Sequence, residues 1–89
     1  MARVVFTSNL KQHVDCDETS ATGNTVREVL DHIFAENRLL RGYVVDEHGR
    51  LRKHMAIFVN NQPLKDRVEL SDAVSEDTEI YVMQALSGG

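Results

Sequence analysis

The clearest pattern along the chain is a stripe of apolar residues at helical spacing. It recurs at positions i, i+3, i+4, i+7 and i+8 and consists of Val26, Val29, Leu30, Ile33 and Phe34. This spacing puts the five side chains on one face of an α-helix. Thr25 and Glu28, at the start of the stripe, have capping-box spacing, in which each side chain accepts a hydrogen bond from the other residue's backbone N–H. We predict an amphipathic helix over about residues 25–38, ending near Asn37, since Asn tolerates the left-handed conformation at helix ends.

Segments rich in β-branched and aromatic residues on both sides of this helix predict the strands of a sheet. The expected strands are residues 3–8, 13–18, 55–59 and 78–83, with a short edge strand around Leu64 and Val68 that tolerates Pro63. The expected connections are a loop at 20–23, a small irregular hairpin within 39–54, a tight turn at 60–61 and a short helical turn at 71–74.

This order of elements predicts a fold. The helix must bury its apolar stripe against one face of the sheet. The last strand carries apolar residues on both faces, so it must pair centrally, and pairing parallel to the first strand satisfies this. We therefore expect an α+β protein with the β-grasp (ubiquitin-like) fold. Its mixed sheet has four to five strands, with the first and last parallel and central. The domain covers residues 1–84, and residues 85–89 form a flexible tail.

Charge and composition exclude several classes of function. The net charge is −4, which argues against nucleic acid as the main partner. Basic residues crowd the middle of the chain, at Arg38, Arg41, Arg50, Arg52 and Lys53. Acidic residues dominate the end, at Asp66, Glu69, Asp72, Glu76, Asp77 and Glu79. No apolar run approaches the length that spans a bilayer, and the N-terminus is too short in apolar residues for a signal peptide, so we expect a cytoplasmic protein without a membrane partner.

The cysteine and histidine residues do not indicate a metal site or a catalytic nucleophile. The single Cys16 forms no internal disulfide and has no His or acid placed beside it as a nucleophile would require. The four His residues show no spacing typical of zinc ligands, so we expect no metal site.

The chain ends in Gly88 and Gly89, shortly after the last expected strand. Residues without a Cβ can enter a slot that is too narrow for side chains, and a chain end carries a free carboxylate. The end therefore fits delivery of a carboxylate into another protein's active site. A frayed terminus is the plain alternative.

Three features of the sequence together resemble the ThiS/MoaD family of sulfur carrier proteins, and especially its CysO-like branch. They are the β-grasp pattern over essentially the whole chain, the segment 51–60 that ends in Phe58-Val59-Asn60, and the ending Leu86-Ser87-Gly88-Gly89. The chain is longer than typical thiamine-pathway carriers, and the extra length lies near residues 39–54. Small subunits of molybdopterin synthase often carry prolines where this chain has Gln84 and Ala85, which disfavours that role.

The resemblance implies a carrier that is a substrate of other enzymes and not an enzyme itself. A ubiquitin-activating-type adenylyltransferase would use ATP and magnesium to adenylate the carboxylate of Gly89. A persulfide or sulfurtransferase donor would then give a thiocarboxylate, and a sulfur-accepting synthase would take the sulfur. Gly88 and Ser87 would keep the tail slim. The chain itself would bind no cofactor.

The resemblance also implies residues that contact these enzymes. Strand alternation turns Tyr81 and Met83 to the face opposite the helix, where the adaptable Met side chain suits contacts with successive partners. Leu86 would anchor the base of the tail, and Lys11 lies near a basic contact position of relatives. Three alternatives stay open, namely a modifier conjugated to lysines, the small subunit of a molybdopterin-synthase-type enzyme, and a plain interaction module. The final acceptor of the sulfur also stays open.

Overall fold

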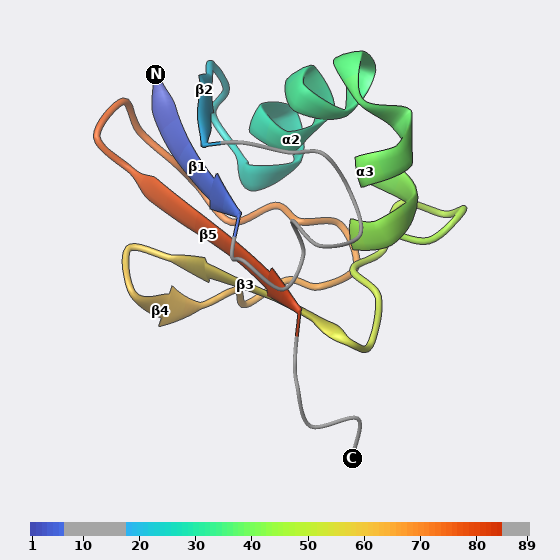
Figure 1. Ribbon diagram of the computed structural model, residues 1–89. Helices are drawn as coiled ribbons and strands as arrows, with labels where there is room; N and C mark the ends of the chain where they lie inside the picture. The colour runs from blue at the N-terminus through green and yellow to red at the C-terminus, as the bar shows by residue number, and fades with distance from the viewer. Residues whose placement is uncertain (7–17, 85–89) are drawn as a thin grey trace.

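The computed structural model describes residues 1–6 and 18–84. Its strands are β1 (Ala2–Phe6), β2 (Thr19–Ala21), β3 (Met55–Val59), β4 (Gln62–Pro63) and β5 (Glu79–Gln84), and its helices are α2 (Val26–Glu36) and α3 (Arg38–Val44). The five strands form one mixed sheet in the order β2-β1-β5-β3-β4. The two helices lie in a layer on one face of this sheet (Figure 1).

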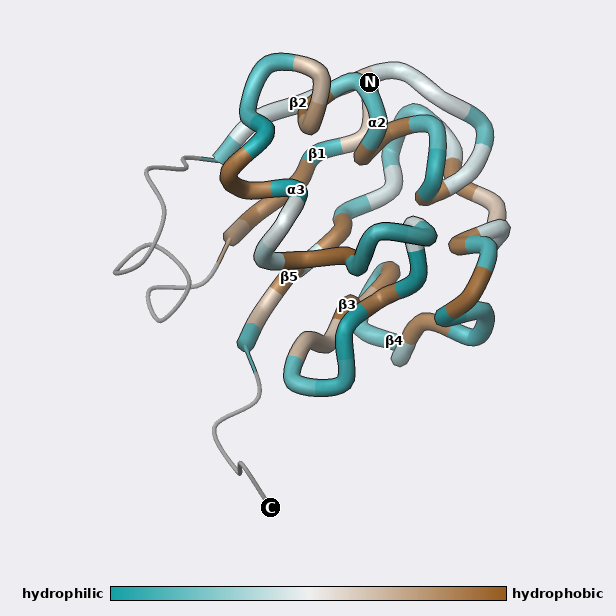
Figure 2. The backbone as a smooth tube through the Cα atoms, turned by 90° about the vertical axis from the view of Figure 1, so that its right-hand side faces the viewer, coloured by the Kyte–Doolittle hydropathy of each residue, from teal (hydrophilic) through white to brown (hydrophobic). Residues whose placement is uncertain are grey.

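The central strand β5 confirms the expected β-grasp topology. It pairs parallel with β1 through Val4↔Ile80 and antiparallel with β3 through Ile57↔Val82. Among these residues, Val4, Ile80 and Val82 are fully buried between sheet and helices. Figure 2 shows hydrophobic colouring along β3 and β5 in the middle of the molecule. The first and last strands are therefore parallel, adjacent and central, as the sequence predicts.

The apolar stripe of α2 packs on the sheet as expected. Val26, Val29, Leu30 and Phe34 are buried, and Ile33 packs against the same core. Burial of a side chain of this size contributes about 1.5–3 kcal/mol each. This one helix face therefore provides a large share of the interaction that holds the helix layer on the sheet.

The ends of α2 differ in detail from the prediction. The Thr25 hydroxyl accepts a hydrogen bond from the Glu28 N–H at 3.2 Å, but the Glu28 carboxylate accepts from the Asn24 N–H, at 3.0 Å, and not from Thr25. Asn37 ends the helix with φ −146°, so the expected left-handed conformation is wrong. Instead, the Asn37 side chain accepts from the Leu40 N–H at 3.1 Å and begins α3. One residue thus ends one helix and caps the next.

Two elements contradict the sequence prediction. Helix α3 lies where irregular structure was expected, although the small hairpin after it is confirmed by the bridge Val45↔Leu51. Strand β2 begins at Thr19 and includes Ser20 and Ala21, which were expected in a loop. The expected strand at 13–18 falls, except for its last residue, outside the described residues, and that residue is not in a strand.

Two shorter segments also differ from the prediction. The edge strand β4 ends at Pro63, so Leu64 and Val68 lie outside it, although Pro63 does occupy a sheet edge as expected. Ala73 forms a bridge with Thr25 in place of a helical turn, because the segment 71–74 pairs with the chain that enters α2. This pairing ties the segment before β5 to the start of the helix.

Turns close the sheet and fix the connections between layers. Asn60 and Asn61 have φ values of 49° and 69°, which confirms the tight turn between β3 and β4. The Asn60 side chain also accepts a hydrogen bond from the Glu79 N–H at 2.9 Å, which ties this turn to β5. In the part of the chain that the structure describes, neither helix combines the length and the apolar character needed to cross a bilayer.

Candidate docking face beside the chain end

The sheet delivers the C-terminal segment from its centre. Strand β5 ends at Gln84, which pairs with Met55 at the start of β3. The predicted reactive residue Gly89 and the tail residues Ser87 and Gly88 lie outside the described residues, as do Leu86 and Lys11. The structure therefore places the root of the tail but not the tail, and the candidate site is the surface around that root.

Tyr81 and Met83 lie on the face of the sheet opposite the helices. Both are half-buried, while their neighbours Ile80 and Val82 are fully buried on the helix side. This alternation along β5 confirms the orientation that the sequence predicts for the two candidate contact residues.

Neighbouring strands extend these two residues into a continuous surface. Tyr81 is paired with Val5 of β1 and Phe58 of β3, and Met83 is paired with Ala56 of β3. Directly paired residues share a face of the sheet and lie close enough for their side chains to interact. We call this surface the apolar face; its members are Val5, Ala56, Phe58, Tyr81 and Met83, and all five are half-buried.

The sequence reasoning missed Val5, Ala56 and Phe58 as members of this face. Each belongs to a strand that was predicted, but the pairing register decides which of their side chains lie beside Tyr81 and Met83. Once the pairing of β1 and β3 with β5 is known, the alternation of side chains along each strand identifies these three residues as members of the face.

Charged groups border the apolar face at the end remote from Gln84. The Arg3 guanidinium donates to the Glu18 carboxylate at 2.8 Å and to the Glu79 carboxylate at 3.0 Å. The hydrogen bond to Glu18 and the charges of Glu18 and Glu79 raise the pKa of Arg3. These side chains are about half exposed, so their ion pairs add little to the stability of the fold. Their main effect is to hold one another in place at the border of the apolar face.

The other shifted groups serve turns and not chemistry. Backbone hydrogen bonds from Arg50 and His48 lower the pKa of Asp46, and a hydrogen bond from Ser71 lowers that of Asp66. Both carboxylates lie in connections away from the apolar face. Within residues 1–6 and 18–84, no group of His, Cys, Asp or Glu side chains is placed to hold a metal ion.

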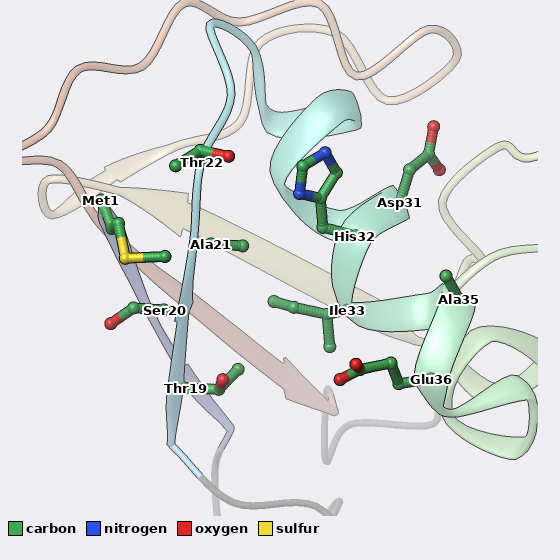
Figure 3. Close-up of a pocket in the computed structure, with 10 residues that line it drawn as sticks. All are labelled: Met1, Thr19, Ser20, Ala21, Thr22, Asp31, His32, Ile33, Ala35 and Glu36. Carbon is green, nitrogen blue, oxygen red and sulfur yellow. The ribbon is translucent and has the colours of Figure 1, made fainter.

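A separate groove of about 480 Å³ lies between β2 and α2. Figure 3 shows Ile33 reaching from α2 toward Ala21 of β2, while the Asp31 carboxylate points away. The groove is on the helix side of the sheet, at the strand furthest from β3. It is therefore not part of the surface around the tail root.

A mixed sheet with parallel first and last strands, a helix layer on one face and a chain end leaving the central strand defines a ubiquitin-like β-grasp protein. The chain belongs to the ThiS family, which matches residues 5–89. It is accordingly a ubiquitin-like β-grasp protein of this family. No curated protein matches the chain significantly.

Solved structures share this fold across nearly the whole chain. The structure of a BexX/CysO complex from Amycolatopsis orientalis matches with a TM-score of 0.82 and 21% identity, covering 100% of both chains. Small archaeal modifier protein 1 from Methanosarcina acetivorans matches at 0.81 and 19%, covering 99% of this chain and 95% of the other. CysO from Mycobacterium tuberculosis matches at 0.79 and 20%, covering 97% and 100%. At these identities the likeness establishes the fold.

Proposed function

We propose that the protein is a sulfur carrier whose C-terminal Gly89 carries sulfur as a thiocarboxylate. The observation that supports this most is the ThiS family match, which extends over the tail to residue 89. The Gly-Gly end follows the central strand after a short spacer, and the apolar face offers a partner enzyme a surface beside the tail root. Gly88 and Ser87 lack bulk, so the tail can enter a narrow active site.

The chemistry has two activating steps, both catalysed by partners. A carboxylate oxygen of Gly89 attacks the α-phosphate of ATP, which is bound with magnesium by a ubiquitin-activating-type adenylyltransferase, and pyrophosphate leaves. A persulfide sulfur of the donor protein then attacks the acyl carbon, and AMP leaves. Attack of a donor thiol on the resulting acyl disulfide forms a protein disulfide and releases the thiocarboxylate. A sulfur-accepting synthase consumes it, and this chain binds neither ATP nor magnesium by itself.

The experiment that tests the proposal is intact mass spectrometry of the full chain. The chain is incubated with ATP, magnesium, the adenylyltransferase of its own organism and a sulfur donor. We expect the mass gain of exchanging one oxygen for sulfur, located at Gly89 by fragmentation. A variant that lacks Gly88 and Gly89 is the control. An unchanged mass with every adenylyltransferase of the organism would overturn the proposal.

Docking through the apolar face predicts a further result. Met83→Glu places a charge on the face beside the tail root, where a partner's apolar surface would have to desolvate it. We expect adenylation efficiency to fall at least about tenfold with the fold retained, since Met83 is only half-buried. Gln62→Glu on the exposed edge strand adds the same charge and serves as the control. Equal loss in both variants would contradict docking on this face. Leu86 and Lys11 are proposed contacts of the same partner.

A modifier role is the second candidate. It is favoured by the fold shared with small archaeal modifier protein 1, and it uses the same adenylate. Mass spectrometry of cell extracts distinguishes the two, because a modifier leaves Gly89 in isopeptide linkage to lysines of other proteins. Copurification with a large partner subunit would instead indicate a synthase subunit, and full function without Gly88 and Gly89 would indicate a plain interaction module.

A further inference from the structure

A second concave surface lies around the start of β3, on the other side of the tail root from the apolar face. Its volume is about 430 Å³. The lining residues come from α3 and from the segment that leads into β3; they are Arg38, Leu39, Gly42, Tyr43, Arg52 and His54. We call this surface the α3 pocket. All of its lining residues except Arg38 belong to the segment 39–54.

The α3 pocket is lined by Leu39 and Tyr43, which we call its floor, and by basic residues, which we call its rim. Leu39 is 63% exposed, one of the few large apolar side chains of the described residues that are left open to water. Arg38, Arg52 and His54 supply basic groups, and no acidic residue lines the pocket. Within residues 1–6 and 18–84, no carboxylate forms an ion pair with any of these three groups.

The rim is held in place by the fold. The Nε of Arg52 donates to the carbonyl of Gly42 at 2.7 Å, which holds the guanidinium over α3. The carbonyls of Arg52 and Met55 both accept from the Arg67 guanidinium, at 2.9 and 3.0 Å. The segment that carries Arg52 and His54 is thus fixed at both ends, and a partner finds these groups already ordered.

The α3 pocket lies beside the tail root, within reach of an enzyme that binds the tail. His54 directly precedes Met55, which pairs with Gln84. Strand β5 runs antiparallel to β3, so β5 ends beside the segment that ends in His54. The residues after Gln84 span at most about 17 Å when extended. Any enzyme that holds Gly89 in its active site therefore has its surface within that distance of the tail root.

We infer that the α3 pocket is a second docking site for the adenylating enzyme, taking an acidic segment that presents one large apolar side chain. The apolar side chain fills the floor beside Leu39 and Tyr43, and the flanking carboxylates meet Arg38, Arg52 and His54. The charge of the rim selects an acidic partner, and the net charge of −4 on the whole chain makes this basic patch distinctive. The inference rests on the proposed function, and it identifies the α3 pocket as the surface by which the carrier recognises its adenylating enzyme.

Gly42 provides the sharpest test. Gly42 lines the pocket, and a Cβ there would meet no atom within 4 Å, so a side chain is accommodated at this position without a clash. In Gly42→Glu the new carboxylate fills the pocket and lies one helical turn from Arg38, whose charge it offsets. We expect the KM for the carrier in adenylation to rise at least about tenfold with kcat unchanged. Gln62→Glu adds the same charge on the edge strand β4, away from the pocket, and is the control that is expected to match the wild type.

Charge reversal gives an independent check. Arg38→Glu is expected to raise the same KM, and added salt is expected to raise the wild-type KM while affecting this variant less. Lys65→Glu makes the same charge change away from the pocket and is the matched control. If the wild type is adenylated and Gly42→Glu and Arg38→Glu keep the wild-type KM, the inference is wrong while the proposed function stands.

A peptide titration tests the pocket even where adenylation fails. The probe is a short peptide with a central phenylalanine between aspartates and glutamates, followed by amide NMR shifts of the full chain. We expect shifts that cluster at Leu39–Tyr43 and Arg52–His54 and that vanish in Gly42→Glu. Shifts on the apolar face alone, or none at all, would overturn the inference. A lack of adenylation of the wild type alongside clustered shifts would instead remove the proposed function and keep the pocket as an acidic-peptide site.

Discussion

Asp66 shows how a single residue organises a connection that has no regular structure. Its carboxylate accepts hydrogen bonds from the Val68 N–H at 3.1 Å, the Glu69 N–H at 2.9 Å and the Ser71 hydroxyl. The hydrogen bond from Ser71, followed by those from the backbone, lowers the pKa of Asp66 below its ordinary value of 3.8. The charged form is therefore favoured by folding, and the turn that precedes the buried Leu70 depends on it.

The lowered pKa makes stability depend on pH in a defined direction. Stability from Asp66 is fully present above its unfolded pKa and is lost as the pH falls through the lower folded pKa. We expect the free energy of unfolding to fall as the pH drops below about 4, and Asp66→Asn to reduce this slope. Asp77→Asn, in the exposed turn before β5, is the control. Urea titrations across this pH range measure it; an unchanged slope in Asp66→Asn would contradict the assignment.

At the scale of elements, Arg27 links helix α2 to two connections. Its guanidinium donates to the Gly49 carbonyl at 2.8 Å, to the Glu69 carbonyl at 2.9 Å and to the Val68 carbonyl at 3.1 Å. Gly49 has a φ of +80°, and a Cβ there would lie 2.6 Å from Nη1 of Arg27. A side chain at residue 49 would therefore require the Arg27 guanidinium to move, and the positive φ favours glycine there.

Two glycines in neighbouring elements are expected to respond in opposite directions. Gly49→Ala combines a left-handed conformation with a close contact and is expected to lose about 1–2 kcal/mol or more. Gly42→Ala lies in α3 with open space around it and is expected to gain about 0.5–1 kcal/mol. Chemical denaturation of both variants measures the difference. A loss in Gly42→Ala, or no loss in Gly49→Ala, would show that the local backbone differs from this description.

The sequence predicts those elements that carry a strong periodic signal. The apolar stripe of α2, the apolar run of β3 and the alternation of β5 each predict which of their residues are buried. The pair Asn60-Asn61 predicts the turn between β3 and β4. Helix α3 carries no such signal, because its seven residues bury only Leu40 and Val44 and contain Gly42. Strand β2, with the sequence Thr-Ser-Ala, is a strand because β1 pairs with it and not because of its own propensity.

The same division applies to the candidate site. Tyr81 and Met83 follow from alternation within one strand, so their orientation could be predicted. Their neighbours Val5 and Phe58 depend on strand register, which a single sequence does not specify. The α3 pocket depends on a helix that was not predicted and on its distance from the tail root, so no pattern of residues indicated it.

The whole molecule separates a core that holds the fold from a chain end that carries the proposed chemistry. Every member of the described core lies between Ala2 and Val82, and β5 carries the last of them. The apolar face and the α3 pocket lie on either side of the strand end, so a partner would contact both while holding the tail. In this proposal the folded domain is the part that the partner enzyme binds. Specificity for one enzyme then depends on the apolar face and the α3 pocket, which lie around Gln84.

This separation predicts that stability and reactivity can be changed independently. Deleting Gly88 and Gly89 is expected to leave the free energy of unfolding unchanged within about 0.5 kcal/mol and to abolish adenylation. Ile80→Val removes one methylene from the fully buried centre of β5 and is expected to lose about 0.5–1.5 kcal/mol while adenylation below the unfolding transition continues. Denaturation curves and ATP–pyrophosphate exchange on the same samples measure both quantities. A deletion that destabilises the fold would mean that the tail packs on the domain, and a deletion that is still adenylated would mean that Gly89 is not the reactive group.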